Sequence, residues 1–243
     1  MTSFRDRYLR GECEQVWNEL ITLGANVREE PLYSDALAVA RETMQRTRRN
    51  IEMLIPRLES IGYTFGYGWT SPQEADWVKR EPPRLGQPAD DVQEQIARLE
   101  SAGAVLPLSL RAFYEIVGAV NFVGEPSATS LRCPGDGVDP LYVDRLISLE
   151  EYQSELLYLE EGEPYSLSIC PDNLVKYNIS GVGALYIEIP CLTADAQLCL
   201  EGDYLDETFV VYLRTCFPQG GFRDEPPLSE TELAYVTTEL LPI

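Results

Sequence analysis

The sequence contains no histidine among its 243 residues. A Ser-His-Asp triad, a Cys-His pair and a histidine-ligated metal site are therefore excluded. Carboxylate chemistry stays open, because the chain has 40 aspartate and glutamate residues. A glycosidase-like hydrolase would need two such acids about 5–10 Å apart across a cleft. We expect a protein that is not an enzyme and has no cofactor or metal, with a carboxylate-based hydrolase as an alternative.

Cysteine pairs and long apolar runs are missing as well. No two of the six cysteines are separated by two residues, so the sequence has no zinc-ribbon or thioredoxin-like pair. The first residues, MTSFRDRYLRG, lack the apolar segment of a secretion signal. No apolar run approaches the ~20 residues that a membrane helix needs. These features predict a cytoplasmic protein with free thiols.

Basic residues are scarce in the second half of the chain. The net charge is −21; residues 1–105 hold 13 basic and 17 acidic residues, and residues 106–243 hold 6 and 23. Because phosphate groups are bound through positive charge, we expect no nucleic-acid or membrane partner. A basic protein would be attracted, and its encounter with the chain accelerated. The alternative is that the acidity only keeps the protein in solution.

Apolar residues at helical spacing fill the N-terminal third. Apolar residues recur every three or four positions from Leu9 to Leu23, which predicts a helix over residues 4–23. A seven-residue repeat of apolar residues predicts a second helix from about Ser34 to Ile61. Pro56 is expected to weaken the last turn of the second helix. The two helices predict an antiparallel hairpin within an N-terminal helical extension, residues 1–85. Its apolar stripe faces either the protein's own core or a partner helix.

The rest of the chain, residues 86–243, has the pattern of an α+β domain. Residues 90–102 predict a helix, and Ser109 is expected to cap the next helix, which ends near Val117. Alternating or β-branched segments predict strands, and amphipathic segments between and after them predict helices. The strand candidates are Leu141–Val143, Tyr165–Cys170, Leu174–Asn178 and Ala184–Ile189, and the helix candidates are Leu149–Leu159, Thr208–Phe217 and Glu230–Leu241. We expect an antiparallel sheet flanked by helices.

The order of these parts resembles the SMI1/KNR4 (SUKH) superfamily over residues 90–222. The resemblance rests on a helix, a Leu-Pro start to a second helix with Phe-Tyr inside it, an antiparallel sheet and a closing aromatic helix. The matching segments are Ile96–Leu99, Leu106–Val117, Tyr165–Pro171, Ala184–Pro190 and Thr208–Phe217. The resemblance implies a protein-binding scaffold with no catalytic set.

Two kinds of function follow from this resemblance. Bacterial members are similar to immunity proteins that neutralise polymorphic toxins, often nucleases, and a nuclease tends to be basic because it holds phosphates. Fungal members look like adaptors in signalling. We therefore expect an acidic immunity-type binding protein, with an adaptor that assembles through its helical N-terminal region as the alternative. The oligomeric state stays open.

Acidic stretches are the candidate contacts for a basic partner. The candidate residues are Glu160, Glu161, Glu163, Glu201, Asp203, Asp206 and Glu207. The alternative is that each stretch is only a solvated face of the protein. The spacing of Asp203, Asp206 and Glu207 does not fit an EF-hand loop, so calcium is not expected there.

Overall fold

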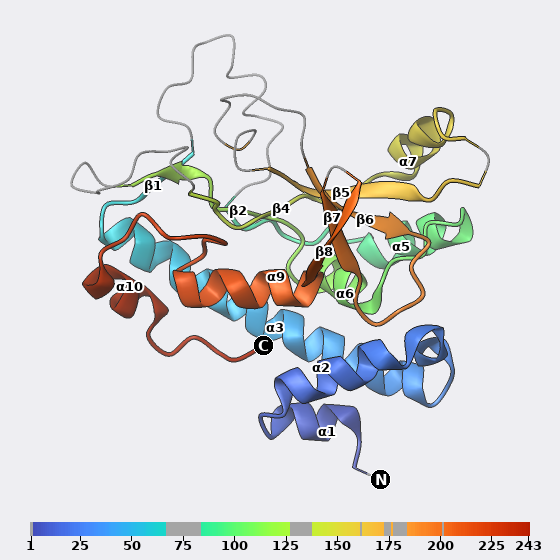
Figure 1. The fold of residues 1–243 in the computed structure, drawn as a ribbon, viewed down its shortest axis with the longest axis horizontal. Helices are drawn as coiled ribbons and strands as arrows, with labels where there is room; N and C mark the ends of the chain where they lie inside the picture. The colour runs from blue at the N-terminus through green and yellow to red at the C-terminus, as the bar shows by residue number, and fades with distance from the viewer. Residues whose placement is uncertain are drawn as a thin grey trace.

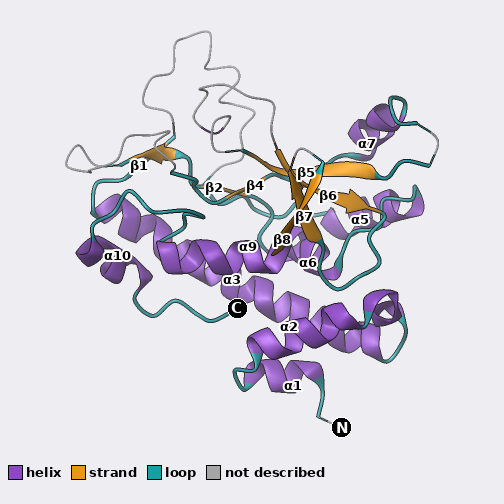
Figure 2. Cartoon of the chain, viewed as in Figure 1, coloured by secondary structure: helices purple, strands orange, loops and turns teal. Residues whose placement is uncertain are grey.

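The computed structural model describes residues 2–66, 84–126, 138–160, 162–172, 176, 184–200 and 202–243. The helices are α1 (Phe4–Leu9), α2 (Cys13–Thr22), α3 (Leu32–Ser60), α5 (Val92–Ser101), α6 (Leu108–Ile116), α7 (Leu149–Leu156), α9 (Phe209–Cys216) and α10 (Glu230–Thr237). Two short 3₁₀ helices, η1 (Gly24–Arg28) and η2 (Phe217–Gln219), follow α2 and α9. In Figure 2, helices α3, α9 and α10 lie on one side of the molecule and the short strands on the other.

Within the described residues every strand pair is antiparallel, and the predicted α+β class is confirmed. The largest sheet has the order β5-β6-β7-β8, built from β5 (Tyr165–Pro171), β6 (Ala184–Ile189), β7 (Gln197–Leu200) and β8 (Asp203–Thr208). Two small pairs join β1 (Thr64–Phe65) to β3 (Gly124–Glu125) and β2 (Val120–Asn121) to β4 (Tyr142–Val143). The predicted strand Leu174–Asn178 lies outside the described residues, apart from Lys176.

The N-terminal helical hairpin is present, but the first predicted helix is wrong in one respect. Residues 4–23 form two helices instead of one, because the chain turns between Leu9 and Cys13. Gly11 has a φ of +99°, a conformation that glycine adopts without the steric cost of a side chain. The second helix matches the predicted segment closely, and Pro56 lies inside it.

Helix α3 runs through the middle of the molecule, with α1 and α2 on one side and the strands on the other (Figure 1). Its apolar stripe faces the protein's own core, where Met44, Ile51, Leu54 and Leu58 are fully buried. The same core includes residues of α6 and α9. Both predicted segments, residues 1–85 and 86–243, thus contribute to one core, and the division between them stays a prediction.

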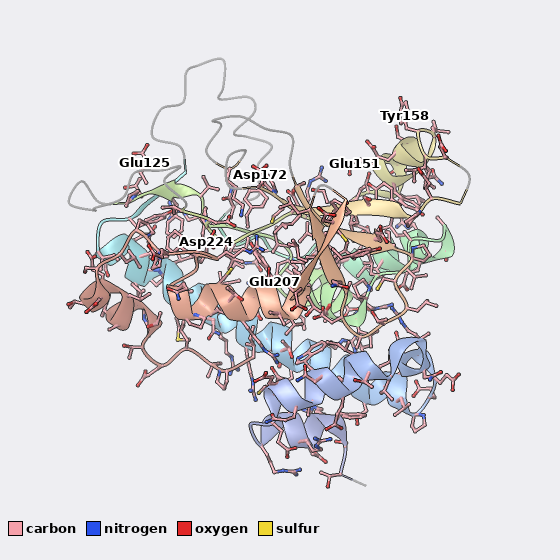
Figure 3. All side chains as sticks on the ribbon, viewed as in Figure 1. Glu125, Glu151, Tyr158, Asp172, Glu207 and Asp224 are labelled. Atoms are coloured by element: carbon pink, nitrogen blue, oxygen red, sulfur yellow. The ribbon has the colours of Figure 1, made fainter. Side chains whose placement is uncertain are left out.

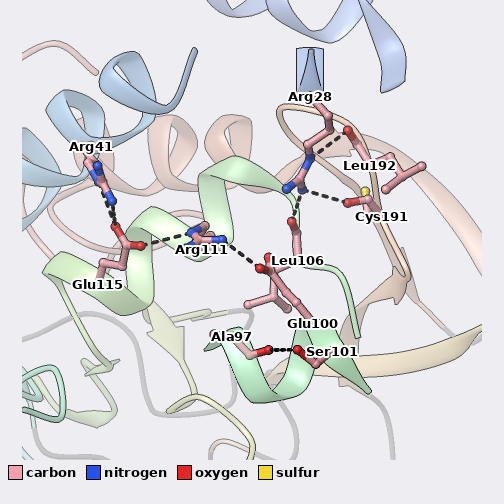
Figure 4. Close-up of polar contacts among 10 residues, drawn as sticks. All are labelled: Arg28, Arg41, Ala97, Glu100, Ser101, Leu106, Arg111, Glu115, Cys191 and Leu192. Carbon is pink, nitrogen blue, oxygen red and sulfur yellow. Dashed lines mark hydrogen bonds and ion pairs between the residues drawn. The ribbon is translucent and has the colours of Figure 1, made fainter. Parts of the chain in front are cut away.

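Three arginines add polar contacts to this packing (Figure 4). Arg28, at the end of η1, donates to the backbone carbonyls of Leu106, Cys191 and Leu192. Arg41 of α3 pairs with Glu115 of α6 at 2.8 Å. Arg111 lies between Glu115 and Glu100, at 3.1 and 2.9 Å. These contacts fasten the helical hairpin to α6 and to the loop after β6.

The predicted capping role of Ser109 is wrong. Helix α6 begins at Leu108, with Pro107 as its N-cap residue, two residues before the predicted cap. The Ser109 hydroxyl instead donates to Asp195 Oδ1 at 2.5 Å, across 86 residues of sequence. Asp195 Oδ2 accepts the backbone N–H of Val210, at the start of α9, at 3.0 Å. Burial raises the pKa of the Asp195 carboxyl, which links α6 to α9.

In the described part of the chain, no helix is both long enough and apolar enough to cross a membrane.

Candidate functional site

The four-stranded sheet has one buried and one open face. Leu185 and Ile187 of β6 point into the core, and Tyr186 and Glu188, which alternate with them, are half-buried on the other face. This is the two-residue alternation of a strand with one face in solvent. Nothing basic stands on these strands, since β5, β6, β7 and β8 contain no lysine or arginine.

Tyrosines and carboxylates lie together on this open face. Tyr186 pairs with Cys199 in the register of β6 and β7, and Cys199 pairs with Tyr204 of β8. The Tyr204 hydroxyl donates to Glu188 Oε2, and Tyr204 as a residue is 58% exposed. The Tyr186 hydroxyl accepts the backbone N–H of Gly202 at 2.8 Å. We call Tyr186, Glu188, Tyr204 and Asp206 the acidic sheet face.

The hydrogen bond between Tyr204 and Glu188 changes the titration of the tyrosine. The carboxylate accepts the phenolic hydrogen, and this bond raises the pKa of Tyr204 to about 12. A phenolate beside the Glu188 charge would be repelled, so the neutral phenol is favoured. The pair thus holds one negative charge and one aromatic ring in a fixed arrangement at the surface.

A groove of about 580 Å³ lies between the acidic sheet face and helix α2. Its walls include Asn18 and Ile21 from α2 and Glu188, Tyr204 and Asp206 from the sheet. Asp195 also lines it, but both carboxylate oxygens of Asp195 are already engaged by Ser109 and by α9. The groove is therefore concave, acidic and partly aromatic.

The predicted contact residues fall in two places. Asp203, Asp206 and Glu207 lie on β8, and two of them, Asp206 and Glu207, line the groove. Glu207 lies near the junction of β8 and α9 (Figure 3). Its charge is partly neutralised by Arg223, which pairs with it at 2.8 Å.

The other predicted residues lie before β5 or outside the described part. Glu160 and Glu163 are exposed in the segment between α7 and β5. Glu161 and Glu201 lie outside the described residues. Sequence reasoning missed Tyr186, Glu188 and Tyr204, although the alternation in Ala184–Ile189 predicted the strand that carries two of them.

The part of the sequence that carries the four-stranded sheet is rich in acidic residues and poor in basic ones. Residues 146–213 hold 13 acidic residues and one basic residue, Lys176. Lys176 is 1% exposed, and its ammonium donates to Asp139 at 2.5 Å and to the Pro140 carbonyl at 2.9 Å. In the helical hairpin, Arg46 pairs with Glu42 and Arg48 with Glu52, both within α3.

Metal ligands are not grouped in the described part of the chain. No set of three or more Asp, Glu or Cys side chains there could hold an ion. The described cysteines, Cys13, Cys170, Cys191, Cys199 and Cys216, are free thiols. Burial raises the pKa of Cys170 to about 11, so this thiol stays protonated at neutral pH.

Comparison of the chain with protein-family models, curated proteins and solved structures finds no match. The resemblance to the SMI1/KNR4 superfamily therefore stays a prediction, and the function has to be argued from the site.

Proposed function

We propose that this protein is an acidic binding scaffold that receives a basic protein on its acidic sheet face. The observation that carries the proposal is the charge distribution around the sheet. Thirteen acidic residues and a single lysine occupy residues 146–213, and that lysine is buried against Asp139. A field of one sign at a concave surface steers an oppositely charged partner toward it.

The side chains of the acidic sheet face suit a protein partner. Tyrosine is enriched in protein interfaces because its ring offers a large contact area at low entropic cost. Tyr204 is exposed and already fixed by Glu188, so little ordering remains to be done on binding. Glu188 and Asp206 would face the lysines or arginines of the partner.

The form of this activity that we propose is neutralisation of a basic nuclease-type toxin. Such a toxin carries a positive surface for phosphates, and an acidic inhibitor that covers this surface blocks the substrate directly. The inhibitor needs no catalytic group for this, and the absence of histidine from the sequence is compatible with such a role.

Affinity capture from the source cell, at about 0.05 M and about 0.5 M salt, tests the proposal. We expect a basic partner at the lower salt concentration that is largely lost at the higher one. A matched capture with Glu188→Lys/Asp206→Lys should lose the same partner at low salt. If only neutral or acidic proteins are retained at low salt, the proposal is wrong.

A further inference from the structure

A second groove, of about 500 Å³, opens along the free edge of the four-stranded sheet. In the described part of the chain, no strand lies beyond β5 in this sheet. The backbone N–H of Asp144 donates to the Ile169 carbonyl at 2.8 Å, so the segment after β4 bonds β5 at Ile169, and residues 144–147 then line the groove. Tyr165, Ser166, Leu167 and Ser168 border the groove.

Helix α7 forms the opposite wall and is held firmly in place. Its N-terminus has a capping box, in which Ser148 and Glu151 exchange hydrogen bonds through their side chains and backbone. Tyr152 packs edge-to-face on Tyr165, with ring centroids 5.1 Å apart. The groove is therefore formed before any ligand enters, which lowers the entropic cost of binding.

The chemistry of this groove favours a basic occupant. Asp144, Glu151 and Glu155 line it, against one cation, Arg145, which pairs with Glu151 at 3.1 Å. The lining thus carries a net negative charge, which a basic segment would offset.

We propose that a basic, extended segment of a partner protein adds to the sheet as a further strand along Tyr165–Ser168. Its backbone pairs with the free edge of β5, and its basic side chains meet Glu155 and Asp144 in the groove. The inference rests on the proposed function and specifies how part of the basic partner is gripped. An unpaired strand edge accepts such a segment through main-chain hydrogen bonds.

The test uses the full chain, labelled with ¹⁵N, and two synthetic peptides of eight alternating lysine and valine residues. The second peptide is N-methylated at two adjacent central residues. Because neighbouring N–H groups in a strand point to opposite edges, this change blocks pairing on both edges and keeps the charge. Amide chemical shifts report the affinity of each peptide and where it binds.

We expect the unmodified peptide to shift the amide signals of Tyr165–Ser168 and to bind at least tenfold more tightly than the methylated one. Glu155→Lys should weaken binding about tenfold, because it reverses a charge on the groove wall. The control Glu239→Lys makes the same charge reversal at an exposed position after α10, away from both grooves, and should leave binding at the edge within about threefold.

Equal binding of both peptides, or shifts confined to Tyr186, Glu188 and Tyr204, would overturn strand addition and leave the proposed function standing. If neither peptide binds the sheet-bearing part at low salt, the electrostatic basis of the proposed function fails together with the inference.

Discussion

The ammonium of Lys176 lies 2.5 Å from the carboxylate of Asp139, away from solvent. This pair removes from the surface the one basic residue between positions 146 and 213. The negative electrostatic potential of the carboxylates in the sheet region is therefore offset mainly by local ion pairs. Examples are Arg223 with Glu207 and Arg145 with Glu151. The one basic residue in this part of the sequence is thus not available at the surface to pair with those carboxylates.

Lys176→Ala is expected to destabilise the protein by about 3–5 kcal/mol, because it removes the 2.5 Å partner of the buried Asp139 carboxylate and leaves the Arg223 guanidinium at 3.9 Å. Urea denaturation measures this free energy of unfolding. As a matched control, Arg49→Ala removes an exposed cation of α3 and should change stability by less than about 0.5 kcal/mol. Similar values for both variants would contradict the buried ion pair.

Much of the second half of the fold is predictable from local pattern. The strand Ala184–Ile189 was expected with the bounds that it has, because its apolar residues alternate and one face is buried. Strands β7 and β8 were missed. Acidic residues are depleted in strands, and β8 (Asp203–Thr208) is held by its pairing with β7, a tertiary effect that overrides propensity.

Other features depend on contacts between residues far apart in the sequence. The position of Ser109 in the sequence is compatible with a helix N-cap, but in the fold its hydroxyl donates a hydrogen bond to Asp195. The pairing of Tyr204 with Glu188 needs the register of three strands. The burial of Lys176 likewise has no local signal. The acidic character of the site was therefore predictable, and its geometry was not.

Removal of residues 1–85 is expected to prevent the remainder from folding cooperatively. The deletion takes Met44, Ile51, Leu54 and Leu58 out of the core. Full burial of such side chains contributes about 1.5–3 kcal/mol each, which together approaches or exceeds the whole stability of many domains, about 5–15 kcal/mol. Far-UV and near-UV circular dichroism during a urea titration of residues 86–243 would show whether this fragment unfolds cooperatively. A sharp unfolding transition in residues 86–243 would instead support two independent domains.

Glu188→Gln should lower the pKa of Tyr204 from about 12 toward the ordinary tyrosine value, near 10. The neutral amide no longer disfavours the phenolate. At about pH 11, Tyr204 should be mostly neutral in the wild type and mostly ionised in the variant. A ¹³C-tyrosine NMR titration reports this, with the distant Glu239→Gln as a control that leaves Tyr204 unchanged. An unaltered Tyr204 titration in Glu188→Gln would contradict the hydrogen bond.

Asp195→Asn is expected to become increasingly favourable as the pH rises from about 4 toward 7. The folded pKa of Asp195 is raised by burial, so the folded state binds the proton more tightly than the unfolded chain. Its ionisation therefore costs stability above the ordinary aspartate pKa, near 4, and asparagine avoids this cost. Thermal denaturation across this pH range gives the difference.

The control for the comparison of wild type and Asp195→Asn across pH is Asp195→Ala, which loses the hydrogen bonds to Ser109 and Val210. It should be less stable than the wild type by about 1–3 kcal/mol at neutral pH. A pH dependence that is identical in the wild type and Asp195→Asn would show that Asp195 does not titrate as proposed.

The dissociation constant of the captured basic partner, measured for three forms of the full chain, tests the role of the acidic sheet face most directly. The forms are the wild type, Glu188→Lys/Asp206→Lys, and Glu125→Lys/Glu239→Lys, which carries the same change of net charge on β3 and after α10, away from that face. We predict at least a hundredfold weaker binding for the first double variant and less than about threefold for the second. Equal losses in both variants, or no loss in either, would contradict a localised acidic binding face.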